Sequence, residues 1–407
     1  MKIQEGAARM RNFGILYRYE IKKILMRKIV WAACLIILIV SVVVISADVT
    51  GKYYVDGKVY GTHYHMMTMD RAYARALNAR ALDDELLWQM LEAYSHVPTD
   101  VPRYSMTEEY QTYARPYSAI FGLVRRIMRY DNLEEMLTGD PDGKMLYAEY
   151  AKTLENERKY ANLTENESYF WQKKEAQLET PFVFYYTDGY GKLIASAYSL
   201  CLSMLLFTAV CLSGIFMREH IYRTDQLLLS SRFGKKTLYF AKTAAGLSFI
   251  AVSTLIMTFI VVILSLTIYG ADGFGAALQL LLPLYPYPLR VGQGVIIVYV
   301  LLLLAVLVTG VFVMMLSELL KSENAALALI CGLLFASVFI NVPSRFKILS
   351  IIWSCLPGNV LHTGRVFGLE VVSFFGHFLT VWQAAPILYL LAGGAFVVIG
   401  MRRYTII

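Results

Sequence analysis

Six long stretches without a charged side chain constrain this chain more than any other feature. A helix of about 20 apolar residues crosses the roughly 30 Å hydrocarbon core of a bilayer. The stretches are continuous and do not alternate with polar residues, which favours helices over the strands of a closed barrel. The sequence therefore predicts an all-α integral membrane protein with six transmembrane helices, at residues 29–47, 193–217, 243–268, 291–317, 324–342 and 378–401.

Composition agrees with a membrane protein. The chain is 57% hydrophobic and 17% charged, whereas soluble domains average roughly 45–50% and 25%. The first apolar stretch is long enough to span and lacks a small-residue cleavage pattern, so we expect it to be retained and not removed as a signal peptide. Disulfides are not expected to hold the chain together, because all five cysteines lie in or beside apolar stretches: Cys34, Cys201, Cys211, Cys331 and Cys355.

Charge is distributed unevenly along the chain and predicts its orientation. Residues 48–192 carry 17 Lys and Arg against 23 Asp and Glu, whereas the remainder carries 21 against 8. Basic residues in short loops beside spans mark the cytoplasmic side. They gather in residues 1–28 and 218–242 and near the C-terminus, while the short loops on the other side hold only Arg290, Arg345, Lys347 and Arg365. We therefore expect a multi-pass protein of the cell membrane, bacterial in source, with both termini cytoplasmic.

Residues 1–28 read as a cytoplasmic amphipathic entry helix. The segment is basic, and its apolar residues recur at three- and four-residue spacing, which is typical of a helix lying at the membrane surface. The alternative is a disordered basic tail with chance periodicity. The residues that form the apolar face are Phe13, Leu16, Tyr17, Ile21, Ile24 and Leu25.

The pattern of residues 48–192 predicts a mainly helical extracytoplasmic domain between the first two spans. Asp140-Pro141 is typical of an N-cap followed by a first-turn proline, and Thr164 with Glu167 matches a capping box. The frequent tyrosines suit either a binding surface or a helical core. His63 and His65 lack a third ligand, so no metal site is expected.

The outer loop at residues 343–377 contains an apolar segment, 348–356, that is too short to span and is broken by Pro357-Gly358. It predicts a re-entrant or a surface hairpin. In the last span, Gly393, Gly394 and Gly400 either pack closely against a neighbouring helix or occur by chance.

Motifs for catalysis are missing from the sequence. Gly234-Lys235-Lys236 lacks the first glycine and the Ser or Thr of a phosphate loop. The apolar stretches contain no Asp, Glu, Lys or Arg of the kind that ion-coupled transporters bury at midplane, and no nucleophile–base pair is visible. We expect no enzyme, no cofactor bound by this chain and no nucleic-acid partner; transport against a gradient would need energy from another subunit.

One segment carries a resemblance. Glu219 follows the second span, an apolar LLLSS (residues 227–231) and Gly234 come next, and Lys242 opens the third span. Together with Glu20-Ile-Lys-Lys in the entry helix, the insert after span one and the broken hairpin at Leu356-Pro-Gly, this order resembles the type-2 ABC transporter permease family.

The resemblance implies that residues 218–242 form a coupling loop on a separate ATP-binding subunit, which holds ATP and Mg. A second permease, identical or not, would complete an exporter, and membrane lipid surrounds it. The residues assigned to coupling are Glu219, Leu227, Leu228, Leu229, Gly234 and Lys242.

Other interpretations stay open at this point. The basic turn at residues 232–236 suits anionic lipid head groups as well as a motor subunit, and the loop as a whole could serve topology alone. The protein could be a sensor or resistance module whose outer domain binds a peptide or envelope component. It could also be a receptor that works without a motor.

Overall fold

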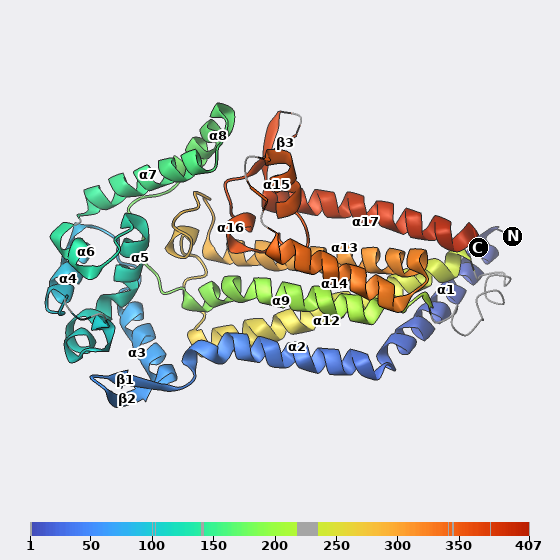
Figure 1. Cartoon of the computed structure of the whole chain (residues 1–407), viewed down its shortest axis with the longest axis horizontal. Helices are drawn as coiled ribbons and strands as arrows, with labels where there is room; N and C mark the ends of the chain where they lie inside the picture. The colour runs from blue at the N-terminus through green and yellow to red at the C-terminus, as the bar shows by residue number, and fades with distance from the viewer. Residues whose placement is uncertain are drawn as a thin grey trace.

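The computed structural model describes residues 2–99, 101, 103–139, 142–217, 235–340, 342–343, 346–374 and 376–406. Long helices run along the major axis of the molecule, a group of shorter helices lies at one end, and both termini lie at the other (Figure 1). We call these ends the domain end and the terminal end.

Five helices in the described part of the chain are long and apolar enough to cross a membrane. They fit a multi-pass membrane protein. They are α2 (Lys28–Ser46), α9 (Asp188–Leu212), α12 (Lys236–Tyr269), α13 (Val291–Leu320) and α17 (Val381–Ile406).

The segment expected as the fifth span forms a shorter helix. Helix α14 (Glu323–Phe339) has 17 residues, about 26 Å at 1.5 Å per residue. Its sharp start follows from the two residues before it: Lys321 adopts a left-handed backbone with φ 47°, and the Ser322 hydroxyl accepts a hydrogen bond from the Ala325 amide. Six spans therefore remain a prediction, because five of the described helices are long and apolar enough to cross a membrane.

Two helices extend beyond the expected ends of their spans. Helix α12 begins at Lys236 and not at Thr243, and α13 continues through Glu318 to Leu320. Both additions contain charged residues, and Lys242 and Glu318 are buried. Both residues lie outside the apolar stretches 243–268 and 291–317, so the charges that these two helices bury are at their ends and not within the stretches.

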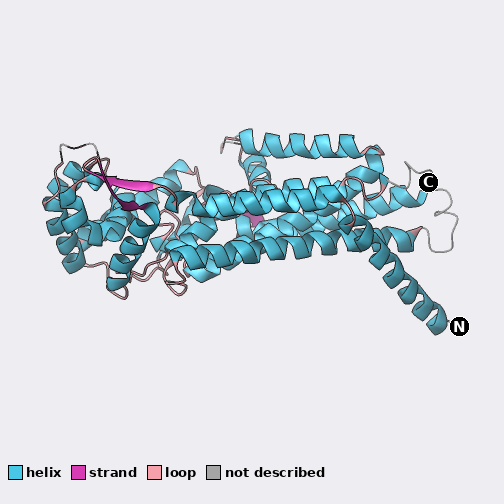
Figure 2. Ribbon diagram, turned by 90° about the horizontal axis from the view of Figure 1, so that it is seen from below, coloured by secondary structure: helices cyan, strands magenta, loops and turns pink. Residues whose placement is uncertain are grey.

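The N-terminal helix α1 (Lys2–Leu25) leaves the bundle at an angle (Figure 2). The side of α1 that packs on the bundle contacts mainly α12. The bend falls between Leu25 and Lys28, where Arg27 has an extended backbone. A helix is therefore present where a disordered tail was the alternative.

The region between α2 and α9 is mainly helical, as expected. A two-stranded antiparallel hairpin, β1 (Lys52–Val55) with β2 (Lys58–Thr62), precedes six helices. The helices are α3 (His63–Ala76), α4 (Asp84–Ser95), α5 (Ser118–Met128), α6 (Leu133–Gly139), α7 (Gly143–Tyr160) and α8 (Glu165–Glu175). Short 3-10 or π turns in this region lie at Ala47–Val49, Tyr104–Met106, Tyr110–Ala114 and Arg115–Tyr117. A further 3-10 turn, Leu278–Leu280, lies between α12 and α13.

Local signals in this region were partly correct. The capping box at Thr164 and Glu167 is confirmed at the start of α8. Helix α7 is capped instead by Asp142, whose side chain accepts from the Met145 amide, while Asp140 and Pro141 lie outside the described residues. Asp142 lies directly before the helix, where its carboxylate reaches the free amides of the first turn. The tyrosines divide between the two interpretations: Tyr94 is buried and Tyr160 is exposed.

The hairpin at residues 343–377 packs into the bundle. It contains α15 (Lys347–Ser354), α16 (Thr363–Val366) and the first strand of a second antiparallel pair, β3 (Val371–Phe374) with β4 (His377–Thr380). Its Pro357 carbonyl accepts a hydrogen bond from the Cys201 thiol, halfway along α9, and the Cys355 carbonyl accepts one from the Tyr389 hydroxyl of α17.

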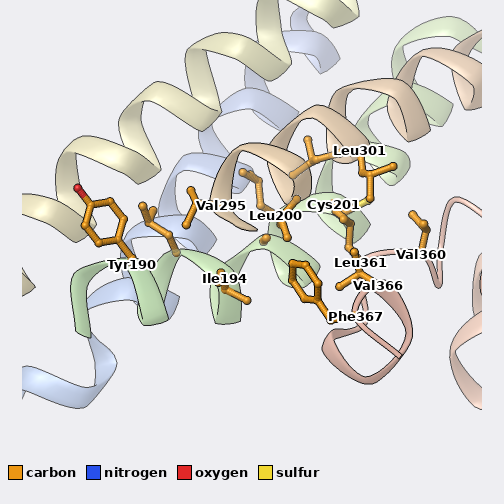
Figure 3. Packing of buried hydrophobic residues seen from close by; sticks show 14 of the residues in the cluster. Tyr190, Ile194, Leu200, Cys201, Val295, Leu301, Val360, Leu361, Val366 and Phe367 are labelled. Atoms are coloured by element: carbon orange, nitrogen blue, oxygen red, sulfur yellow. The ribbon is translucent and has the colours of Figure 1, made fainter. Parts of the chain in front are cut away.

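Figure 3 shows Leu361, Val366 and Phe367 of the hairpin gathered against Leu200 and Cys201 of α9. Non-helical backbone at membrane depth is tolerated where protein covers it and donors satisfy its carbonyls. The depth of this contact favours the re-entrant alternative over the surface one.

Helix α8 links the region between α2 and α9 to this hairpin. The Trp171 indole donates to the Leu369 carbonyl at 2.9 Å and is fully buried, and its ring packs edge-on against Tyr287 with centroids 5.0 Å apart. The Lys347 ammonium of α15 donates to both carboxylate oxygens of Glu167, at 2.6 and 2.5 Å. A displacement of α8 would therefore act on the hairpin directly.

Candidate functional site: a buried ionic cluster at the terminal end

The site expected from the sequence spans residues 218–242. Of its assigned residues, Glu219, Leu227, Leu228, Leu229 and Gly234 lie outside the described residues. Lys242 is described, on the second turn of α12. The structure therefore places the root of the expected coupling loop: the end of α9 on one side and the start of α12 on the other.

Lys242 is buried, with 1% of its surface exposed. Its ammonium donates to the Ile215 carbonyl at 3.0 Å and lies 3.7 Å from a carboxylate oxygen of Glu20 on α1. It also sits over the Phe216 ring, 5.4 Å from the centroid, at a distance suited to a cation–π interaction. In this conformation Lys242 has no surface with which to contact a partner subunit, and its partners fix the position of residues 215–216.

The end of α9 is capped from three other elements. Helix α9 stops at Leu212, where Ser213-Gly214 breaks the pattern, and the last carbonyls of a helix have no partner within it. Here the Cys211 carbonyl accepts from Arg27 at 2.7 Å, the Ser213 carbonyl from the Ser317 hydroxyl at 2.5 Å, and the Ile215 carbonyl from Lys242. These donors come from the α1–α2 junction, α13 and α12.

Two of the three capping donors are cations, which the negative end of a helix dipole favours. Each cation also has a carboxylate partner. Arg27 donates to a Glu323 carboxylate oxygen at 2.8 Å, and Glu20, besides facing Lys242, accepts from Lys23 at 2.6 Å. The cluster thus ties α1, α9, α12 and α14 together by charge-assisted contacts.

The Glu323 side chain lies close to the backbone of Gly214, which suits a residue without a side chain. A β-carbon added there would lie 2.6 Å from a carboxylate oxygen of Glu323. A larger residue at 214 would therefore displace the Glu323 carboxylate, which lies at the flexible end of its side chain and also accepts from Arg27.

Aromatic side chains close the cluster beside α17. Phe216 stacks on Tyr239 with centroids 5.4 Å apart, and both rings contact Tyr404, at 5.6 and 5.7 Å. The Tyr239 hydroxyl donates to the Val397 carbonyl at 3.0 Å. The glycines of this helix, for which close packing and chance were the two alternatives, divide: Gly400 lies close to Tyr239, while Gly394 has open space around it.

Sequence reasoning missed most of this cluster. Glu20 appeared only as part of the family resemblance, and Arg27 and Glu323 were counted only as charges. The sequence did contain a signal that Glu20 is buried. This residue lies three positions after Tyr17 and four before Ile24, which places it on the apolar face of α1. A carboxylate on such a face needs a buried partner, yet the partner's identity depends on the tertiary fold.

The chemistry of the cluster is that of an anchor and not of a reaction centre. Its groups bind one another and backbone carbonyls. Among the described residues, no group of three or more His, Cys, Asp or Glu side chains is arranged to hold a metal ion. The arrangement holds the end of α9 with residues 213–216, and the start of α12, in one position relative to α1, α13 and α14.

Comparisons with known proteins identify no relative. No family model matches the chain, and no curated protein or solved structure is similar to it.

Proposed function

We propose that this chain is the membrane-spanning subunit of an ABC transporter, of the exporter type, and that a separate ATP-binding subunit docks on residues 218–242. One observation carries the proposal. Side chains from three other elements cap the backbone from which this segment departs, at Cys211, Ser213 and Ile215.

A loop that transmits motion has to be held rigidly at its root. A tether of free backbone would absorb the displacement, whereas a capped and ion-paired root passes it to the helices that hold it. Lys242 and Arg27 connect that root to α12 and to the α1–α2 junction. In this proposal Lys242 is a positioning residue, while Glu219 and the apolar face at Leu227, Leu228 and Leu229 make the contact with the motor.

The remaining parts take their roles from this arrangement. ATP and Mg bind the partner subunit, a second permease completes the complex, and both termini are cytoplasmic. The region between α2 and α9 then lies outside the membrane, where α8 rests on the hairpin at residues 347–374.

Reconstitution with the ATP-binding subunit tests the proposal. We expect the purified chain alone to hydrolyse no ATP, and the pair to hydrolyse ATP faster than the motor alone. Glu219→Ala and Leu228→Asp should lower that stimulation about tenfold, equivalent to about 1.4 kcal/mol of lost docking free energy, without removing the protein from the membrane. Glu165→Ala, an exposed glutamate of α8, is the matched control and should leave stimulation unchanged.

Two results contradict the proposal. Robust ATP hydrolysis by the chain alone would rule out a separate motor. Stimulation and transport at the wild-type level in both loop variants would show that residues 218–242 do not couple to one.

A further inference from the structure

An open apolar groove lies at the bend between α1 and α2. It encloses about 380 Å³ against α12, within the range of about 300–1,000 Å³ found for small-molecule sites. Each of the three helices contributes apolar side chains to its wall: Tyr17 and Ile21, Trp31 and Cys34, and Val252 and Ile256.

The bend of the chain creates this groove. Helix α1 leaves the bundle at an angle (Figure 2), so its apolar stripe diverges from α2 while still packing on α12. Trp31 stands at the mouth, 61% exposed, and its indole nitrogen donates to the Leu25 carbonyl across the bend at 2.8 Å. Tryptophan with one apolar and one polar side is typical of the membrane–water interface.

Two cations flank the groove on α1. Arg18 and Lys22 directly follow the wall residues Tyr17 and Ile21, which places each of them about 100° further around the helix. Both are exposed, and no carboxylate among the described residues forms an ion pair with either. Lys23, on the other side of the helix, is instead engaged by Glu20.

We propose that this groove binds one anionic phospholipid. An acyl chain lies along the apolar wall, and the phosphate of the head group binds Arg18 and Lys22. The observations that select this occupant are the apolar lining, its opening on helices long and apolar enough to span a membrane, and two cations at its rim that form no ion pair with a described residue. Anionic head groups are attracted by basic residues at that level of a bilayer.

The bound lipid would also support the ionic cluster. Glu20 lies on the face of α1 next to the groove and contacts Lys242. A lipid that fills the groove would hold α1 against α12 and so keep Glu20 in place. This inference requires only that the chain spans a membrane and is independent of the proposed coupling to a motor.

Native mass spectrometry of the purified full chain with added phosphatidylglycerol or phosphatidylcholine tests the proposal. We expect one phosphatidylglycerol to be retained in preference to phosphatidylcholine. Arg18→Gln with Lys22→Gln should weaken that retention on the order of 30-fold, from the usual contribution of two basic residues near a membrane surface. Arg402→Gln with Arg403→Gln, two exposed cations of α17, should leave it unchanged.

Filling the groove tests the acyl-chain part. Val252→Trp should abolish retention, whereas Val300→Trp should not, because Val300 on α13 has similar exposure, 50% against 55%, and lies outside the groove. Equal retention of both lipids, or equal loss in the groove and control variants, would overturn the proposal.

The reactivity of two native cysteines tests the lipid site without any substitution in the protein. Cys34 lines the groove and Cys331 lies on α14, and both are partly exposed. Phosphatidylglycerol should slow the reaction of Cys34 with a maleimide and leave Cys331 unaffected. Equal protection of both thiols would indicate a general lipid belt and would contradict a specific site.

Discussion

Lys242 is the residue on which the ionic cluster depends most. Replacing it by Met removes the donor to the Ile215 carbonyl and the cation facing Glu20. We expect Lys242→Met to lower the free energy of unfolding by about 2 kcal/mol, the usual loss for a buried hydrogen bond to a charged group. Thermal or denaturant unfolding in detergent measures this.

A matched control exists on the same helix. Lys236 is exposed on the first turn of α12, and Lys236→Met should change stability by less than about 0.5 kcal/mol. Combining Lys242→Met with Glu20→Gln should cost less than the two single changes added together, because each single change removes one partner from a buried charge. Strict additivity would show that Glu20 and Lys242 do not interact.

Glu167 gives a pH-dependent contact at the domain end. Burial disfavours its carboxylate, but hydrogen bonds from Lys347 and Thr164 outweigh burial and lower its pKa below the ordinary value of 4.5. Because the folded pKa is depressed, this contribution to stability is present above that value and is lost as pH falls through the folded pKa.

We therefore expect Glu167→Gln to be less stable than wild type at pH 7 and to lose less stability on acidification below about pH 4.5. Glu92, an exposed glutamate of α4, provides the control: Glu92→Gln should follow the wild-type pH profile. Parallel profiles for wild type and Glu167→Gln would contradict the assignment. Melting temperatures across the pH series supply the comparison.

At the scale of elements, contacts with α12 hold the backbone at and just beyond the two ends of α9. At the terminal end the contact runs through Lys242. At the domain end it is closer: a β-carbon on Gly189 would lie 1.9 Å from the carbonyl oxygen of Gly270, which ends α12 with φ +102°. The Ser265 hydroxyl also donates to the Gly189 carbonyl at 2.9 Å.

Gly189→Ala should therefore separate the two helices at this end. Because the obstructing atom is backbone and cannot rotate away, we expect a loss of about 3 kcal/mol, at the upper end of overpacking costs. Gly394→Ala on α17, where nothing lies within 4 Å of the added carbon, should cause no loss. If the two variants unfold at the same temperature, the close approach of α9 and α12 is absent in solution.

At the scale of the whole molecule, the termini and the α3–α8 region lie at opposite ends of the long helices (Figure 1). Positive charge near the spans predicts that the terminal end is cytoplasmic. In intact cells an impermeant maleimide should label Tyr160→Cys, which replaces a side chain 74% exposed on α7. It should not label Arg403→Cys until the membrane is permeabilised. The reverse pattern would invert the topology, and labelling of both would place both ends on one side.

The sequence by itself determined the class of protein, because uninterrupted apolar stretches leave helices as the way to satisfy backbone groups in lipid. It also determined features that depend on near neighbours, such as the Thr164–Glu167 capping box and the break at Pro357-Gly358. It predicted a span from Thr243, whereas helix α12 begins at Lys236, since a lysine such as Lys242 reads as the edge of a span unless its partners are known.

Only the tertiary structure decided which charges meet. Glu20 and Lys242 are 222 positions apart in the chain, and Arg27 and Glu323 are 296 apart. Local patterns carry no information about such pairs, because their energy depends on which helices pack together and at what level. The same holds for the groove at the α1–α2 bend, whose walls come from three helices and whose shape follows from the angle at which α1 leaves the bundle.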